Sequence, residues 1–225
     1  MTPIDLIVFD LDGTLADTVP DIAAALAATL AEVGVPAPPL SVVTELVGDG
    51  SRALIERALS RAGSPDDPER LVPRFVDHYA AHLCVGSHLY PGVTDALEAA
   101  RGAGVALAVV TNKIGALARG LVGSLGIAPF FTAVIGDGDG FPRKPDPTAA
   151  KSIMARVGTV AARTAVIGDG LPDMRTARAA GALAIAAAWG YVAPTRLRAE
   201  SPDAVAATIE EAMRFALGGS RPEAP

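Results

Sequence analysis

Residues 4–15 read IDLIVFDLDGTL, in which a mostly apolar run is followed at once by two aspartates, a glycine and a threonine. A short apolar run bounded by a turn is typical of a strand buried on both faces, as in a parallel sheet. Four later segments have the same character, at 105–110, 132–135, 164–167 and 183–187. Segments with helical spacing accompany these strands, at 93–102, 115–125, 148–157, 172–180 and 202–217. The alternation predicts an α/β fold with a parallel sheet.

The spacing of the strands predicts an insertion after the first one. Later strands start about 20–32 residues apart, whereas about 95 residues separate the first strand from the second. This gap holds helical patterns at 21–33, 51–62 and 67–82. We therefore predict a Rossmann-like parallel sheet core, formed by residues 1–16 and 88–225, and an inserted helical cap formed by residues 17–87. The tail 218–225 is expected to be disordered.

The composition excludes several classes of protein. The chain has 225 residues and a net charge of -6, and it has no Lys/Arg cluster of the kind that binds nucleic acid. Its longest apolar run, Ala182–Trp189, is far shorter than the roughly 20 residues that span a bilayer. No Lys or Arg precedes Arg52, and Asp5 and Asp10 interrupt the apolar residues near the start, so we expect no secretory signal there. We expect a cytoplasmic monomer or homodimer with no nucleic-acid or membrane partner.

Carboxylates follow two of the predicted strands. Asp10 and Asp12 end the first strand, while Asp169 and Asp173 end the fourth and begin the next helix. Neighbouring carboxylates repel each other, and a hard cation such as Mg²⁺ relieves that repulsion. The alternatives are a solvated Asp-Gly turn at the first pair and simple complementation of a helix dipole at the second. Ligands bind where parallel strands end, so convergence favours a site.

Two further segments carry groups suited to phosphate. Thr111, Asn112 and Lys113 end the second strand and offer a hydroxyl, an amide and an amine, although a helix cap is the alternative reading. Lys144 stands before Pro145, which restricts its backbone. Lysine accounts for only 3 of the 19 basic residues, so this lysine favours a functional role, neutralising a phosphoryl group, over a surface cation.

These segments together resemble a known family. The chain carries, in order, Asp10-x-Asp12-Gly13-Thr14, Thr111-Asn112, Lys144-Pro145 and Gly168-Asp169-x-x-x-Asp173. This set resembles the four motifs of the haloacid dehalogenase superfamily in order, spacing and placement at strand ends. One position departs from the pattern, because Gly170 stands where the family usually has Ser or Thr. Residues 47–59, 90–93 and 189–191 are similar to the phosphoglycolate phosphatase branch.

The resemblance implies a mechanism. Asp10 would attack phosphorus and form an aspartyl-phosphate, and Asp12 would protonate the leaving oxygen and then activate water. Mg²⁺ would be bound by Asp10, the backbone carbonyl of Asp12 and Asp169, with Asp173 as a ligand or a supporting group. Thr111, Asn112 and Lys144 would hold the transferring oxygens, with Lys113 beside them. The retained Asp12 argues against the dehalogenase branch, which lacks a carboxylate there.

The cap is expected to choose the substrate. Gly48-Asp49-Gly50 indicates a flexible turn that approaches the core, and Arg52 after it could pair with a substrate carboxylate. The alternative is that Arg52 is a solvated helix residue. The substrate is expected to be a small phosphorylated metabolite, with 2-phosphoglycolate the first choice. A β-phosphoglucomutase, a 5′-nucleotidase, a pyrophosphatase and a non-catalytic phosphate-binding regulatory module are alternatives.

Overall fold

The computed structural model describes residues 3–218, so residues 1–2 and most of the tail predicted to be disordered lie outside the described part. Six strands form one sheet in the order β5-β4-β1-β6-β7-β8, and every pairing is parallel. Their bounds are β1 Leu6–Phe9, β4 Ala106–Ile114, β5 Phe131–Asp137, β6 Thr164–Gly168, β7 Leu183–Ala187 and β8 Ala204–Ala206. The predicted α/β fold with a parallel sheet is confirmed.

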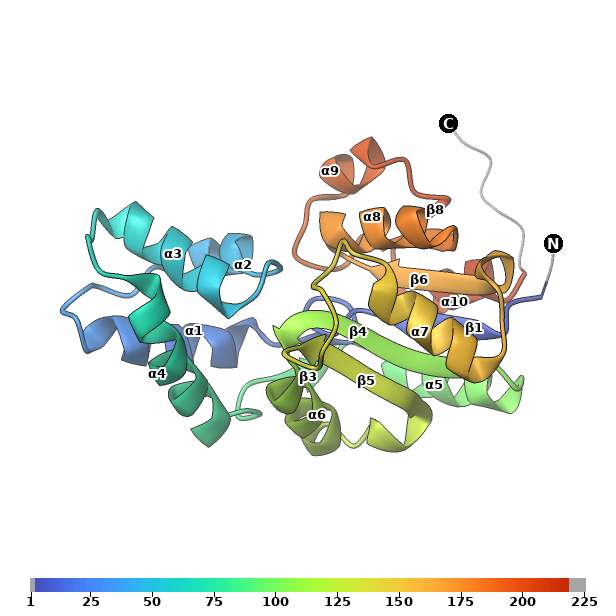
Figure 1. The fold of residues 1–225 in the computed structure, drawn as a ribbon, viewed down its shortest axis with the longest axis horizontal. Helices are drawn as coiled ribbons and strands as arrows, with labels where there is room; N and C mark the ends of the chain where they lie inside the picture. The colour runs from blue at the N-terminus through green and yellow to red at the C-terminus, as the bar shows by residue number, and fades with distance from the viewer. Residues whose placement is uncertain (1–2, 219–225) are drawn as a thin grey trace.

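Helices cover both faces of this sheet (Figure 1). One face carries α5 (Val93–Gly102), α6 (Gly115–Ser124) and α10 (Ile209–Ala216), and the other carries α7 (Thr148–Val157), α8 (Leu171–Ala180) and α9 (Pro194–Ala199). Short 3-10 helices, η1 (Ala128–Phe130) and η2 (Ala161–Arg163), precede β5 and β6. In β1, Ile7 and Phe9 face the first layer while Leu6 and Val8 face the second. Burial on both sides explains the apolar run that opens the chain.

Four helices lie between β1 and α5 in the chain. They are α1 (Val19–Ala31), α2 (Leu40–Leu46), α3 (Ser51–Ala62) and α4 (Pro68–Ala81). Figure 1 shows them grouped beside the sheet, on the side away from both chain ends. They pack around their own apolar cluster, which Leu117 of α6 joins from the core. Four amphipathic helices can thus bury their apolar faces together, while the proposed limits of the cap at residues 17 and 87 stay a prediction.

The two crossings between the helical group and the sheet lie side by side. β2 (Ala16–Asp17) pairs antiparallel with β3 (His88–Leu89). Next to this pair, the carboxylate of Asp21 in α1 accepts backbone N–H bonds of 2.8–3.0 Å from Val85, Gly86 and Ser87. The Ser87 hydroxyl donates a fourth bond of 2.6 Å. The buried side chain of Asp21 therefore fixes residues 85–87, where the chain returns to the sheet, to α1, the helix that follows β2.

We expect Asp21→Asn to lower the free energy of unfolding by about 2 kcal/mol, because an amide cannot accept from all four donors. That corresponds to a fall in Tm of roughly 4–8 °C in thermal unfolding. Burial opposes the Asp21 charge, but the hydrogen bonds from Ser87, Gly86 and Val85 outweigh it and lower its pKa. A lowered pKa adds stability above the ordinary value of 3.8, so the difference from wild type shrinks as pH falls below it. Asp95→Asn, exposed in the first turn of α5, is the control; equal Tm values for the two variants would contradict the role of Asp21.

Several elements differ from the sequence prediction. The helix predicted over 202–217 is wrong in its first half, where β8 pairs with β7 and only α10 is helical. Pairing at the sheet edge overrides the helical preference of alanine there. The short helices α2 and α9 were not predicted. β4 continues to Ile114, so Thr111 and Lys113 lie within the strand and not beyond its end.

Candidate active site

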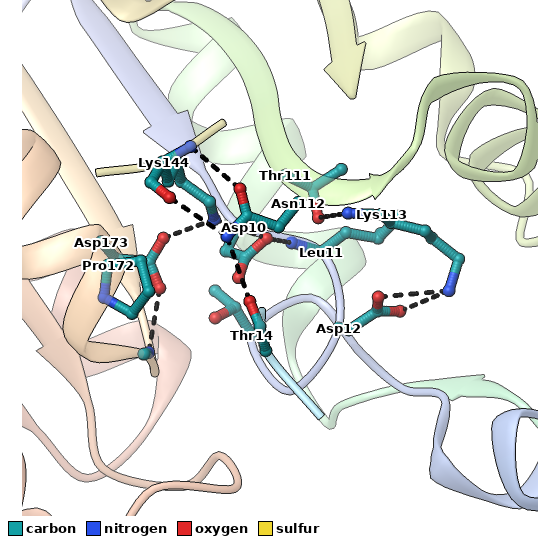
Figure 2. A network of polar contacts seen from close by, with 12 residues as sticks. Asp10, Leu11, Asp12, Thr14, Thr111, Asn112, Lys113, Lys144, Pro172 and Asp173 are labelled. Carbon is teal, nitrogen blue, oxygen red and sulfur yellow. Dashed lines mark hydrogen bonds and ion pairs between the residues drawn. The ribbon is translucent and has the colours of Figure 1, made fainter. Parts of the chain in front are cut away.

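The ends of three neighbouring strands meet at one edge of the sheet. β1 lies between β4 and β6, and Asp10 follows β1 directly while Asp169 follows β6 directly. Thr111, Asn112 and Lys113 occupy the last part of β4. In open α/β sheets this edge is where ligands bind. Figure 2 shows the side chains that the strands bring together there.

Three carboxylates and one ammonium form the centre of this edge. Carboxylate oxygens of Asp10, Asp169 and Asp173 lie within 4.8 Å of one another. Lys144 Nζ lies 2.9 Å from Asp10 Oδ1 and 2.5 Å from Asp173 Oδ1. Three negative charges and one positive charge leave two negative charges in a buried space, which one divalent cation would balance. The oxygen-only donor set fits Mg²⁺.

Burial controls the protonation of this cluster. Burial, together with repulsion from Asp10 and Asp173, raises the pKa of Asp169 to about 8. Burial also raises the pKa of Asp173 to about 6, although Lys144 acts in the opposite direction. Burial disfavours the charge on Lys144, but attraction to Asp10 and Asp173 outweighs it and raises the Lys144 pKa. Without a cation, the folded cluster therefore retains protons that an unfolded chain would release.

Three glycines leave room for the carboxylates from β6 and α8. A Cβ at Gly13 would lie 2.3 Å from Asp169 Oδ2, and a Cβ at Gly190 would lie 2.2 Å from Asp169 Cβ. A Cβ at Gly168 would lie 2.2 Å from Asp173 Cγ. Contacts this short cannot be accommodated without moving Asp169 or Asp173. The glycines therefore determine how closely the carboxylates can approach Asp10.

Gly170, where the family pattern has Ser or Thr, still supports Asp173. Its backbone N–H donates to Asp173 Oδ2 at 2.9 Å. Its backbone is extended (φ −104°, ψ 155°), a conformation that any residue adopts. A Cβ there would lie 3.0 Å from the same oxygen. The backbone contact thus holds the carboxylate without a side-chain hydroxyl.

The side chain of Asp12 belongs to a second network. Figure 2 shows its carboxylate turned toward Lys113, while Asp10 lies on the side of Lys144 and Asp173. Lys113 Nζ donates to Asp12 Oδ1 at 2.9 Å and to Oδ2 at 3.1 Å. The Thr18 hydroxyl also donates to Asp12 Oδ1, at 2.7 Å. The Asp12 carboxylate is therefore not among the oxygens that gather around Asp10.

Thr111 and Asn112 have different surroundings. The Thr111 hydroxyl accepts a bond of 3.3 Å from the Lys113 backbone N–H. Asn112 Oδ1 accepts from the Lys144 backbone N–H at 2.9 Å, and its Nδ2 donates to the Gly48 carbonyl at 3.2 Å and to the Lys144 carbonyl at 3.4 Å. Asn112 thus joins β4 to the segment that carries Lys144 and to the turn of the cap at Gly48, called the cap turn below. Lys144 precedes Pro145 through a cis peptide bond.

Arg52 lies outside the site in this structure. Its side chain is 46% exposed, donates to Glu56 at 2.9 Å and also pairs with Glu69 of α4. It does not line either pocket at the strand ends. Gly48, by contrast, borders both pockets, and its φ of 128° is in a range that favours glycine.

Two pockets meet at Asp10 and Asp12. The first extends between core and cap, and its lining residues are Asp10, Asp12, Ile22, Val47, Gly48, Gly50, Ser51, Leu54, Phe75, Tyr79, Thr111, Asn112, Lys113 and Leu117. The second lies over the carboxylate cluster, and its lining residues are Asp10, Asp12, Val47, Gly48, Lys144, Asp169, Gly170, Pro172, Asp173, Tyr191 and Val192. The cap turn at Val47 and Gly48 contributes to both. A ligand can thus contact the cluster and the cap at once.

Two tyrosines at this site were not predicted from sequence as site residues. The Tyr191 N–H donates to Asp169 Oδ2 at 2.8 Å, and its hydroxyl accepts from the Thr18 N–H at 2.8 Å and donates to Asp17 at 3.0 Å. In the sequence, only the similarity of residues 189–191 to the phosphoglycolate phosphatase branch pointed to Tyr191. Tyr79 accepts a bond of 2.7 Å from Lys113 Nζ.

Comparison with known proteins identifies the class. A family model described as haloacid dehalogenase-like hydrolase matches residues 7–187. The chain belongs to this family, and the resemblance seen in its four motifs is confirmed. Among residues 3–218, no helix is both long enough and apolar enough to cross a membrane.

Curated relatives and solved structures give a narrower likeness. The chain is 41% identical to a phosphoglycolate phosphatase of Caulobacter vibrioides over 82% of this chain and 79% of the relative. It is 38% identical to a phosphoglycolate phosphatase of Vibrio parahaemolyticus, over 92% and 94%. A crystal structure from Haemophilus somnus, described as a predicted phosphoglycolate phosphatase, matches with a TM-score of 0.88 at 27% identity, over 96% and 99%.

Proposed function

We propose that this protein is a Mg²⁺-dependent phosphatase that hydrolyses small phosphate monoesters, and that 2-phosphoglycolate is its preferred substrate. The observation that carries the proposal is the buried set of Asp10, Asp169, Asp173 and Lys144, whose three carboxylates, when ionised, exceed the one ammonium by two negative charges. The relatives named phosphoglycolate phosphatase support the choice of substrate. The residue roles below are part of the same proposal.

Asp10 is prepared to act as the nucleophile. Its Oδ1 accepts from the Leu11 backbone N–H at 2.7 Å and lies 2.9 Å from Lys144 Nζ. Its Oδ2 accepts no hydrogen bond from residues 3–218, so this oxygen is the one available to attack phosphorus. The attack forms an aspartyl-phosphate and releases the alcohol. Lys144 and the Thr111 hydroxyl lie where they can contact the transferring oxygens.

Asp12 serves as the acid and then the base. In its protonated form it gives a proton to the leaving alkoxide, and the carboxylate left behind takes a proton from the water that cleaves the aspartyl-phosphate, which restores the protonated form. Its contacts with Lys113 and Thr18 hold the carboxylate beside the pocket until substrate arrives. Asn112 positions the backbone of Lys144 and the cap turn rather than contacting substrate directly, because its amide is already occupied.

Asp10, Asp169 and Asp173 would hold the cation. When bound, Mg²⁺ supplies positive charge that reduces the repulsion between the Asp10 carboxylate and the phosphate dianion. Tyr191 and Thr14 would keep Asp169 oriented, since the Tyr191 N–H donates to Oδ2 at 2.8 Å and the Thr14 hydroxyl donates to Oδ1 at 2.8 Å.

The test is phosphate release with and without Mg²⁺ across a panel of 2-phosphoglycolate, sugar phosphates, nucleoside monophosphates and pyrophosphate. We expect Mg²⁺-dependent release, with kcat/KM for 2-phosphoglycolate at least about tenfold above the others. A preference for nucleotides or pyrophosphate would mean that this compound, and not 2-phosphoglycolate, is the substrate. Isomerisation of a sugar phosphate without release would indicate a mutase, and no activity on any compound would overturn the assignment as an enzyme.

A further inference from the structure

One positively charged side chain lines the pocket between core and cap. Among the described residues that line it, Lys113 is the only one with a positively charged side chain. Its walls on the cap side are largely apolar, with Ile22, Leu54 and Phe75 among them. A positive charge in such surroundings selects for a negatively charged ligand group, because it attracts a group that the apolar walls alone would disfavour.

Lys113 is buried and stays charged. Its side chain is 5% exposed. Burial disfavours the charge, but attraction to Asp12 and the contact with Tyr79 outweigh it, so the pKa of Lys113 is raised. Two of its three N–H donors go to the two oxygens of the same Asp12 carboxylate, which the Thr18 hydroxyl also holds. One of these donors can therefore turn to a second anion while Asp12 keeps a bond to Lys113.

Tyr79 places a second donor beside this ammonium. The residue is 1% exposed, and its oxygen accepts from Lys113 Nζ at 2.7 Å. Its hydroxyl proton has no acceptor among residues 3–218. Burial raises the pKa of Tyr79 to about 12, so the proton remains. A buried O–H without an acceptor on a pocket wall indicates that the acceptor comes from a ligand.

We propose that Lys113 and Tyr79 together bind the negatively charged group that the substrate carries besides its phosphate. This inference rests on the proposed function, in which that group is the carboxylate of 2-phosphoglycolate. The ammonium and the phenol would each donate to the carboxylate, while the phosphate lies at Asp10 on the other side of Asp12. The role first expected of Arg52 thus belongs to Lys113, which lies within the pocket.

The pair also explains selectivity against other phosphate esters. A sugar or nucleoside would place hydroxyl groups and a larger body against the apolar side chains of Leu54 and Phe75. Among the described cap residues that line the pocket, only Ser51 and Tyr79 have polar side chains that could bind those hydroxyl groups. A neutral group of the same size as the carboxylate would form no ion pair with Lys113, which would keep its bonds to Asp12. Selectivity for an acidic substrate is then a property of two side chains, one from β4 and one from α4.

The experiment compares 2-phosphoglycolate with its neutral amide, 2-phosphoglycolamide, and measures kcat and KM for each in the Mg²⁺-loaded enzyme. We expect wild type to prefer the acid by at least about tenfold in kcat/KM, since a hydrogen-bonded charge pair is worth that much. Lys113→Met also frees Asp12, so both substrates lose some kcat. The decisive quantity is the acid-to-amide ratio of kcat/KM, which we expect to fall at least about tenfold, chiefly through KM for the acid.

Tyr79→Phe keeps the ring and removes only the hydroxyl, so it tests the proposal even if Lys113→Met fails to fold. We expect it to lower the same ratio by about threefold to tenfold. Lys151→Met, an exposed lysine on α7, is the matched control and should leave the ratio unchanged. Equal losses for acid and amide in both variants would overturn the inference and assign Lys113 to positioning Asp12 alone. No hydrolysis of 2-phosphoglycolate by wild type would instead overturn the proposed function, and the inference with it.

Discussion

Asp10→Asn lowers kcat at least about 10⁴-fold at saturating Mg²⁺, as expected for loss of the nucleophile itself. An amide oxygen does not attack a phosphate monoester, yet it can still accept the 2.7 Å bond from the Leu11 N–H. The substitution also removes one of the three clustered negative charges. The folded protein therefore keeps its structure, and its Tm in the absence of metal is equal to or above that of wild type.

Phosphate release and covalent trapping test this result together. Acid-quenched wild type should carry phosphate on the protein during turnover, and the variant should carry none. Asp77→Asn, exposed on α4, controls for the loss of one carboxylate and should behave as wild type. Turnover by Asp10→Asn at the wild-type rate would remove Asp10 from the role of nucleophile, whatever its contact with Lys144.

Asp169→Asn has opposite effects on stability with and without metal. In metal-free protein the pKa of Asp169 is raised from 3.8 to about 8. Between these values the folded state holds a proton that the unfolded chain has released, so the free energy of unfolding falls as pH rises. Wild type in chelator should therefore lose on the order of 3 kcal/mol between pH 5 and pH 8 that the variant does not lose. The variant becomes the more stable protein at pH 8.

Saturating Mg²⁺ should reverse that order. Binding stabilises wild type by mass action, whereas the variant has lost a ligand and gains less. Activity should fall at least about 100-fold, since the cation is then held by fewer carboxylates. Thermal unfolding at pH 5, 6, 7 and 8, in chelator and in Mg²⁺, provides the measurement, and Asp77→Asn again serves as control. Parallel pH curves for wild type and Asp169→Asn in chelator would show that Asp169 does not retain its proton.

The sheet and most of the site could be predicted because parallel strands deliver their ends to one edge. Asp10 and Asp169 follow β1 and β6, which are neighbours, so their convergence depends only on strand order. Lys144 was a weaker case, because it lies beyond the edge strand β5 and reaches Asp10 through a segment held by Asn112. Lysine is scarce among the basic residues of the chain, and this feature of the composition, not the geometry of the sheet, indicated a role for Lys144.

The cap residues could not be assigned from local pattern. Arg52 follows the cap turn, but its partner Glu69 is 17 residues away on another helix, and only the packing of α3 against α4 brings them together. Tyr79 lies four residues after Phe75 on the apolar face of α4, so its spacing indicates a core residue. Nothing local distinguishes its hydroxyl from that of any buried tyrosine. The contact with Lys113 arises only when the cap lies against β4.

The paired strands β2 and β3 also define a place where the chain could be rejoined. Asp17 and His88 are opposite each other in that pair, so the roughly 70 residues between them leave and return at nearly the same point. A two-residue hairpin turn spans such a gap, and closing it costs far less chain entropy than closing the long natural loop. We therefore expect that helical segments from related chains can be joined between residues 17 and 88 without changing the register of the six-stranded sheet. Asp21 and Ser87 form their hydrogen bonds just inside that junction. A grafted segment that retains both residues would therefore keep the contact that holds its two ends together.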